Sequence, residues 1–135
     1  MKYMILVYAS QRDYDEMAGA GGSGGWTPEQ FAALGAFMEK FNAELAESGE
    51  FVETRGLTAP VHARQVRVGD GAPVVTDGPY AETTEVLAGY WIVDCDSFDR
   101  ATEIAGRLCQ IPGPAEAAAK AYADIRPVAE SRHEL

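Results

Sequence analysis

The chain has few cysteines, few histidines and few basic residues, and each shortage excludes a class of protein. Its 135 residues include two cysteines, Cys95 and Cys109, which rules out a scaffold held by several disulfides and indicates reduced, inert thiols. Lysine and arginine number 11 against 21 acidic residues, so the formal net charge is -10. Because so acidic a chain offers no basic patch, we expect no nucleic-acid partner and no binding to anionic membranes.

Long apolar runs are also lacking. The N-terminal run Met1–Tyr8 is too short to span a bilayer, and no signal-peptide cleavage site follows it. Hydrophobic residues still make up 47% of the chain, which is ordinary for a globular protein and disfavours disorder. A chain of this length can bury a core without metal support. We therefore expect one cytoplasmic domain over residues 1–135.

Two segments, residues 2–8 and 87–94, are apolar at almost every position. Alternation divides the first segment into two apolar faces, with Tyr3, Ile5 and Val7 on one and Met4, Leu6 and Tyr8 on the other. The second segment divides in the same way. Strands apolar on both faces are central strands covered on both sides.

Capping signals predict two main helices. Thr27 and Gln30 form a capping box around Pro28, and Gly49 suits the left-handed end of that helix. A second helix is capped by Asp96 or Ser97 and is buried along a stripe formed by Phe98, Ala101, Ile104, Ala105 and Leu108.

The remaining segments complete a fold class. Further strands are expected at residues 51–57, 63–68, 72–76 and 122–128, with a short helical turn at 115–120. Residues 9–25 are expected to form a flexible Gly-rich loop, and residues 129–135 a frayed tail. The order is β-α-β-β-α-β with one extra strand, which predicts an α+β, ferredoxin-like sandwich.

Two helices can cover only one face of such a sheet. Because the central strands are apolar on both faces, we expect the second face to pack against the same face of a second copy. The sequence therefore predicts a homodimer of the dimeric α/β-barrel type.

The segment Val75-Thr76-Asp77-Gly78-Pro79-Tyr80-Ala81-Glu82-Thr83-Thr84-Glu85 is the most distinctive part of the chain. Together with the first strand, the Val66-Arg67-Val68 strand and Ile125-Arg126-Pro127-Val128, it resembles the DGPF subgroup of the YCII-related proteins. The resemblance implies a dimeric ferredoxin-like barrel. It also implies an association with extracytoplasmic-function sigma factors and a fold shared with small-molecule enzymes and binders, while naming no general activity.

The chain departs from that family pattern at three points. Tyr80 stands where phenylalanine is usual, and Thr84 where lysine is usual. The histidine of the His-Asp pair proposed as catalytic in founding members is absent, because no histidine occurs between Thr27 and Gly49. That pair cannot be carried over to this chain.

The candidate site residues lie in and near the motif. Asp77, Glu82 and Glu85 place three carboxylates beside Tyr80, and carboxylates crowded at a cleft can act as acid or base. His62 and Arg64 share one strand face and could orient a ligand carboxylate. The candidate catalytic residues are thus His62 and Asp77, and the candidate ligand-binding residues are Asp77, Tyr80, Glu82, His62 and Arg64.

The structural alternatives are a plain turn at Asp77-Gly78-Pro79 and an exposed edge strand at His62. No metal-ligand spacing is recognisable, and we expect no metal and no cofactor.

Three functions fit these observations. The first is binding of a small organic molecule in a pocket between sheet and helices, with cofactor-free isomerase- or lyase-like turnover. The second is a non-enzymatic accessory role in sigma-factor-linked signalling, through protein contacts. The third is a structural dimer module whose pocket is vestigial.

Overall fold

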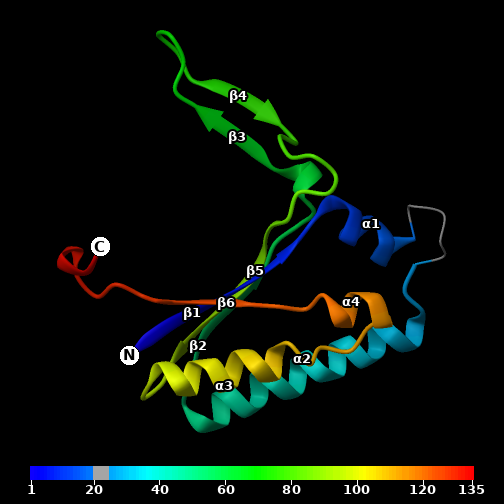
Figure 1. The fold of residues 1–135 in the computed structure, drawn as a ribbon, viewed down its shortest axis with the longest axis vertical. Coiled ribbons are helices and arrows are strands. Elements are labelled where there is room, and N and C mark those ends of the chain that lie inside the picture. The colour runs from blue at the N-terminus through cyan, green and yellow to red at the C-terminus, as the bar shows by residue number, and fades with distance from the viewer. Residues whose placement is uncertain (20–24) are drawn as a thin grey trace.

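A four-stranded antiparallel sheet organises the chain. The structure is a computed structural model, and it describes residues 1–19 and 25–135. The sheet contains β1 (Lys2–Ala9), β2 (Phe51–Gly56), β5 (Val86–Asp94) and β6 (Asp124–Pro127), in the spatial order β2-β5-β1-β6 (Figure 1). The two segments predicted to be central strands, β1 and β5, are indeed the inner pair.

Two helices cover one face of this sheet. Helix α2 (Pro28–Ser48) begins at the predicted Thr27 capping box and ends at Gly49, whose φ of 78° lies in the left-handed region. Helix α3 (Phe98–Leu108) begins at Ser97, whose side chain accepts a hydrogen bond from the Arg100 backbone. Both helices lie against the same side of the strands (Figure 1). This confirms a mixed α+β fold with an antiparallel sheet, in which the ferredoxin-like order fits.

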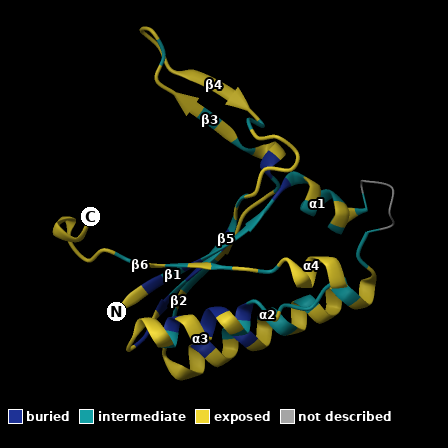
Figure 2. Cartoon of the chain, viewed as in Figure 1, coloured by how far each residue is buried: buried dark blue, intermediate teal, exposed yellow. Residues whose placement is uncertain are grey.

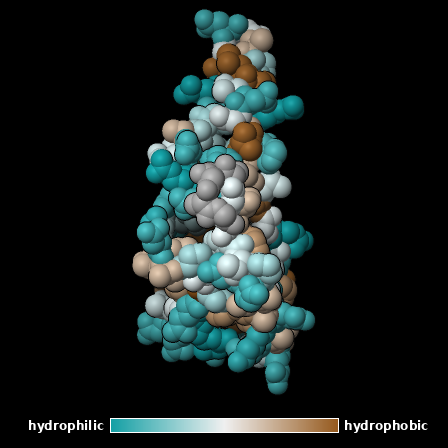
Figure 3. Space-filling model, turned by 90° about the vertical axis from the view of Figure 1, so that its right-hand side faces the viewer, coloured by the Kyte–Doolittle hydropathy of each residue, from teal (hydrophilic) through white to brown (hydrophobic). Residues whose placement is uncertain are grey.

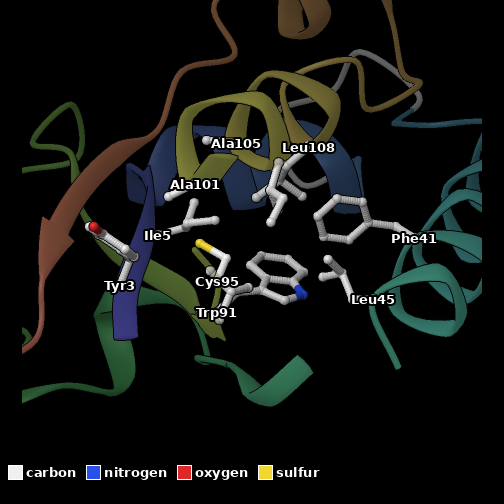
Figure 4. Close-up of a cluster of buried hydrophobic side chains, with 11 residues drawn as sticks. Tyr3, Ile5, Phe41, Leu45, Trp91, Cys95, Ala101, Ala105 and Leu108 are labelled. Atoms are coloured by element: carbon white, nitrogen blue, oxygen red, sulfur yellow. The ribbon is translucent and has the colours of Figure 1, made fainter. Parts of the chain in front are cut away.

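The core lies between the sheet and these two helices. Ile5, Leu45, Val93 and Ile104 are fully buried there, and Figure 2 shows burial concentrated on the facing surfaces of β1, β5, α2 and α3. The Phe41 ring meets Trp91 edge-on at 5.7 Å between centroids (Figure 4). The Trp91 indole N–H donates to Asn42 at 2.8 Å, so its one polar atom stays hydrogen-bonded while the ring is buried.

The opposite face of the sheet carries Met4, Leu6, Tyr90 and Ile92. Cross-strand pairing places Met4 beside Ile92 and Leu6 beside Tyr90, and none of the four belongs to the core. Within residues 1–19 and 25–135 the sheet of the single chain is open and does not close into a barrel.

A second, two-stranded sheet projects away from the body of the protein. It consists of β3 (Arg64–Arg67) and β4 (Val74–Asp77), which pair with each other and with no other described strand, and we call it the hairpin arm (Figure 1). Val66 and Val75 face each other across it, and apolar colour gathers on the arm in Figure 3. Val66 is 66% exposed.

The predicted loop over residues 9–25 is wrong for its first half. Residues Gln11–Ala18 form helix α1, which starts at a capping box between Ser10 and Asp13 and ends at Gly19 with a φ of 78°. The helix is short, buries no residue and is polar at most positions, so it offers no long apolar stripe from which to predict it. The capping box at Ser10 and Asp13 is the local sequence signal for this helix. Residues 20–24 of the predicted loop lie outside the described residues.

The C-terminal region is close to the prediction. Helix α4 (Ala115–Ala119) precedes β6, and the tail predicted to fray contains one exposed 3-10 turn, Arg132–Glu134.

Another 3-10 turn, Pro60–His62, lies much earlier in the chain, immediately before the hairpin arm. Within the described residues, no helix is both long and apolar enough to cross a membrane.

One ion pair fastens α3 to the start of β2. Arg100 holds both carboxylate oxygens of Glu50 at 2.8 Å, and the Glu50 side chain is only 14% exposed. The hydrogen bonds from Arg100 lower the pKa of Glu50 from 4.5 to about 2. The pair therefore stabilises the fold fully above pH 4.5 and is lost as the pH falls toward 2.

We expect Glu50→Gln to lower the free energy of unfolding by about 1–2 kcal/mol at pH 7, after allowance for solvent screening of Arg100, whose side chain is 35% exposed. The deficit should shrink as the pH falls below 4.5, because Glu50 of the unfolded wild-type chain then takes up a proton that the native ion pair excludes until the pH nears 2. Urea unfolding across that pH range measures it. Glu103→Gln is the matched control: Glu103 also contacts Arg100, at 3.0 Å, but is 66% exposed. A deficit that is equal in both variants, or that does not vary with pH, would contradict the assignment.

Candidate functional site

The main cavity lies on the helix-covered side of the sheet, at the end where β1 stops. Its volume is about 280 Å³, and its walls come from β1, α1, α2, β5, α3 and α4 together with Trp26 and Tyr122. This volume is near the lower end of pockets for small organic ligands, about 300–1,000 Å³.

An irregularity in the β1–β5 ladder lies beside this cavity. Val7 pairs with Gly89 and Tyr8 pairs with Leu87, so one step along β1 opposes two steps along β5, and the extra residue is Ala88. Such a bulge disrupts the ladder locally and bends the strand that carries it. Val7 and Tyr8 both line the cavity at this point.

The interior surface of the cavity is largely apolar. Met38, Trp91 and Leu108 form its floor where the core ends, and Met17 and Trp26 add to the walls. Cys109 also lines it, but burial raises the pKa of its thiol, as it does for Cys95. Both cysteines are free, and thiols with raised pKa values are poor nucleophiles at neutral pH.

Tyr8, Tyr122 and Glu85 form the polar rim of the cavity. The rings of Tyr8 and Tyr122 stack at 5.7 Å with 14° between their planes. The Tyr122 hydroxyl donates a hydrogen bond to the Glu85 carboxylate. That bond, more than desolvation, raises the pKa of Tyr122 to about 12, so the hydroxyl keeps its proton at neutral pH.

Helix α1 forms one wall of the cavity and is attached to the motif segment. The Arg12 backbone N–H donates to the Glu82 carbonyl at 2.9 Å, and the Arg12 side chain pairs with the Glu82 carboxylate at 3.4 Å. The Tyr14 hydroxyl donates to the Leu57 carbonyl at 2.8 Å. Asp13, Glu16 and Met17 of α1 then face the cavity.

The predicted site residues do not converge on this cavity. Arg64 and Asp77 pair with each other at 2.8 Å where the hairpin arm joins the body, with side chains 75% and 78% exposed. Glu82 holds Arg12 and does not line the cavity. The fold therefore does not enclose Arg64, Asp77 or Glu82, the residues predicted to bind a ligand, in this cavity.

His62 and Tyr80 do come together, at a second hollow. This hollow has a volume of about 300 Å³ and lies beside the 3-10 turn, with Pro60, Val86 and Leu87 among its lining residues. His62 and Tyr80 are both exposed, so the hollow opens directly to solvent. Asp77 lines neither this hollow nor the main cavity, so the two candidate catalytic residues, His62 and Asp77, do not meet at either of them.

Sequence reasoning missed most of the residues of the main cavity. Glu85 closes the distinctive motif but was weighed only as one of three carboxylates. Tyr122 and Tyr8 were assigned to strands, where nothing indicated that their rings would stack. The available signal is an aromatic residue near the end of β1 and another just before β6, two strands that pair directly with each other, but such a pair has no fixed spacing in the sequence.

Metal ligands are not gathered in the part of the chain that the structure describes. No group of three or more histidine, cysteine, aspartate or glutamate side chains within residues 1–19 and 25–135 could hold an ion. The titratable groups at the cavity are carboxylates, tyrosines, one lysine and Cys109.

Together, the fold and the cavity define a small mixed α+β protein with an antiparallel sheet and a pocket beside it. The chain belongs to the YCII-related domain family, whose model matches residues 1–122. It is 29% identical to the uncharacterised protein R00369 of Rhizobium meliloti (strain 1021) over 108 residues, or 80% of each chain.

Among solved structures, a 5-chloro-2-hydroxyhydroquinone dehydrochlorinase from Burkholderia phenoliruptrix, in complex with 2,5-dihydroxybenzoquinone, aligns with a TM-score of 0.40 and 13% identity. That alignment covers 98% of each chain.

We expect Gly113→Ala to disturb the main cavity through Trp26. A Cβ atom at position 113 would lie 2.9 Å from the Trp26 ring, closer than real contacts allow, so the indole must move. Trp26 and Trp91 are the two tryptophans of the chain, and a change in tryptophan emission maximum or intensity reports the movement. Gly106→Ala is the control, because a Cβ there meets nothing within 4 Å. Unchanged emission in Gly113→Ala would show that Trp26 is not held as described.

Proposed function

We propose that the protein binds a small organic molecule in the main cavity. The observation that supports this most is a cavity of about 280 Å³ with an apolar floor and a few polar groups at its rim. Sites for small ligands combine an apolar interior with a small number of polar groups that fix orientation. The proposal replaces the predicted location at His62 and Asp77 with one bordered by Tyr8, Glu85 and Tyr122.

We further propose that any turnover is an isomerase- or lyase-like proton transfer without a cofactor. A carboxylate next to an apolar cavity can take a proton from a bound molecule and return it to another atom, so an isomerisation consumes nothing. We assign this role to Glu85, and the hydrogen bond that its carboxylate accepts from Tyr122 supports the assignment. We also propose that the chain belongs to the DGPF subgroup of this family, because its Thr76–Glu85 segment resembles the motif of that subgroup.

The natural unit in this proposal is a homodimer of the α/β-barrel type. The open face of the sheet presents Met4, Leu6, Tyr90 and Ile92 in one patch. Self-association through a two-fold axis would bury this patch against its own copy.

An accessory role through protein contacts is the second candidate. The hairpin arm supports it, because Val66, Val68, Val74 and Val75 are all exposed on a ribbon that stands clear of the body. Exposed apolar patches on soluble proteins commonly mark interaction sites. The partner implied by the family resemblance is a component of sigma-factor-linked signalling.

We expect propylbenzene, an apolar probe of suitable size, to bind the wild-type protein in saturation-transfer NMR and calorimetry. Ala121→Phe should weaken this binding at least about tenfold, because the added ring occupies the cavity that Ala121 lines. His62→Ala and Asp77→Ala are controls that should leave it unchanged. The cavity assignment is wrong if these two variants lose the probe and a folded Ala121→Phe protein keeps it.

We expect Ile92→Lys to convert the dimer to a monomer, since it places a charge within the open sheet face. Light scattering coupled to size-exclusion chromatography at micromolar concentration measures the mass. Val66→Lys, on the hairpin arm, is the matched control and should leave the dimer intact. A wild-type monomer would contradict the dimer, and a monomeric Val66→Lys with a dimeric Ile92→Lys would move the interface to the arm.

A further inference from the structure

We infer that the main cavity selects a ring compound that presents an O–H or N–H hydrogen-bond donor and carries no carboxylate. The inference rests on the proposed function and names the ligand chemistry of the same site. It follows from the hydrogen bonds that the polar atoms at the rim make within the described residues, and from the acceptor positions that these bonds leave.

The Tyr122–Glu85 pair presents acceptors to the cavity. Tyr122 commits its single hydroxyl proton to one oxygen of Glu85, which leaves lone pairs on the tyrosine oxygen and on the second oxygen of Glu85. Both residues line the cavity. A hydrogen-bond donor on the ligand that bonds to either oxygen would extend a series of linked hydrogen bonds that ends on a carboxylate. The hydrogen bonds in such a series polarise and strengthen one another.

The other charged residues of the cavity favour the same ligand. Asp13, Glu16 and Glu116 line it together with Glu85, and Lys120 is the one basic residue among its lining residues. Asp13 already accepts from the Ser10 backbone at 2.8 Å, within the cap of α1. Ionised carboxylates accept hydrogen bonds and cannot donate them, so a ligand carboxylate would meet repulsion here.

The shape of the rim favours a planar ring. Tyr8 and Tyr122 are stacked with nearly parallel planes, and Trp26 lies on the wall of the same cavity. Flat aromatic surfaces gain contact and stacking energy against a ring that an open-chain ligand would not give. A ring with a donor substituent can therefore contact these aromatic side chains and reach Glu85 at once.

The test compares five probes built on one propyl-substituted ring. Para-propylphenol and para-propylaniline carry a donor, para-propyltoluene carries a methyl group in its place, para-propylanisole only accepts, and para-propylbenzoate is an anion. At pH 7, calorimetry should show both donor compounds binding at least about tenfold more tightly than the toluene and anisole analogues. The benzoate should bind most weakly.

Glu85→Gln tests the residue that carries the inference. It replaces an acceptor-only carboxylate with an amide, so the preference for the phenol over the toluene analogue should fall to within about threefold. Glu53→Gln is the matched control: Glu53 accepts from the Tyr90 hydroxyl at 2.8 Å, and neither residue lines the cavity. The wild-type preference should persist in it.

The outcomes separate this inference from the function on which it rests. If the toluene analogue binds as tightly as the phenol, the donor requirement is wrong while the cavity remains a binding site. Equal losses of preference in Glu85→Gln and Glu53→Gln would also overturn it. If none of the five probes binds, the proposed function fails and this inference with it.

Discussion

The antiparallel ladder between β1 and β5 is the interaction on which the rest of the structure depends. It runs from the Lys2–Asp94 pair to the Ala9–Val86 pair, and the two outer strands attach to it, β6 through β1 and β2 through β5. Its helix-facing side supplies Ile5, Trp91 and Val93 to the core. The same ladder loses its regular register between Val7 and Tyr8, where the main cavity begins. One pair of strands thus provides both the stable centre and the opening beside it.

The Thr76–Glu85 segment is distinctive in sequence, yet its residues serve different purposes in the fold. Asp77 pairs with Arg64 at the base of the hairpin arm, and Glu82 holds α1 through Arg12. Glu85 is the member that reaches the main cavity. The segment therefore mainly supports the structure around the cavity: it holds helix α1, which forms one wall, and it positions Glu85 at the rim. A motif that looks like a cluster of catalytic groups can be chiefly the support for a site formed elsewhere.

The sequence predicted the elements that depend on local chemistry. The cap at Thr27, the left-handed Gly49 and the two strands with apolar faces all lie where their local patterns require. The main cavity was not predictable in the same way, because its lining comes from many separate parts of the chain and lies beside a register shift that has no sequence signature. Helix α1 was not predicted, because it buries no residue and is followed by glycines, and its one local signal is the capping box between Ser10 and Asp13.

The hairpin arm has a consequence for the behaviour of the protein in concentrated solution. Each of its strands pairs on one side only, which leaves two free edges of backbone N–H and C=O groups beside exposed valines. Free edges of this kind are templates for further strands, and repeated addition leads to aggregation. Arg64, Arg67 and Pro73 interrupt the apolar pattern along the arm and limit such growth. These few interrupting residues therefore oppose edge-to-edge association of the arm, in addition to the mutual repulsion that the net charge of -10 produces between copies of the chain.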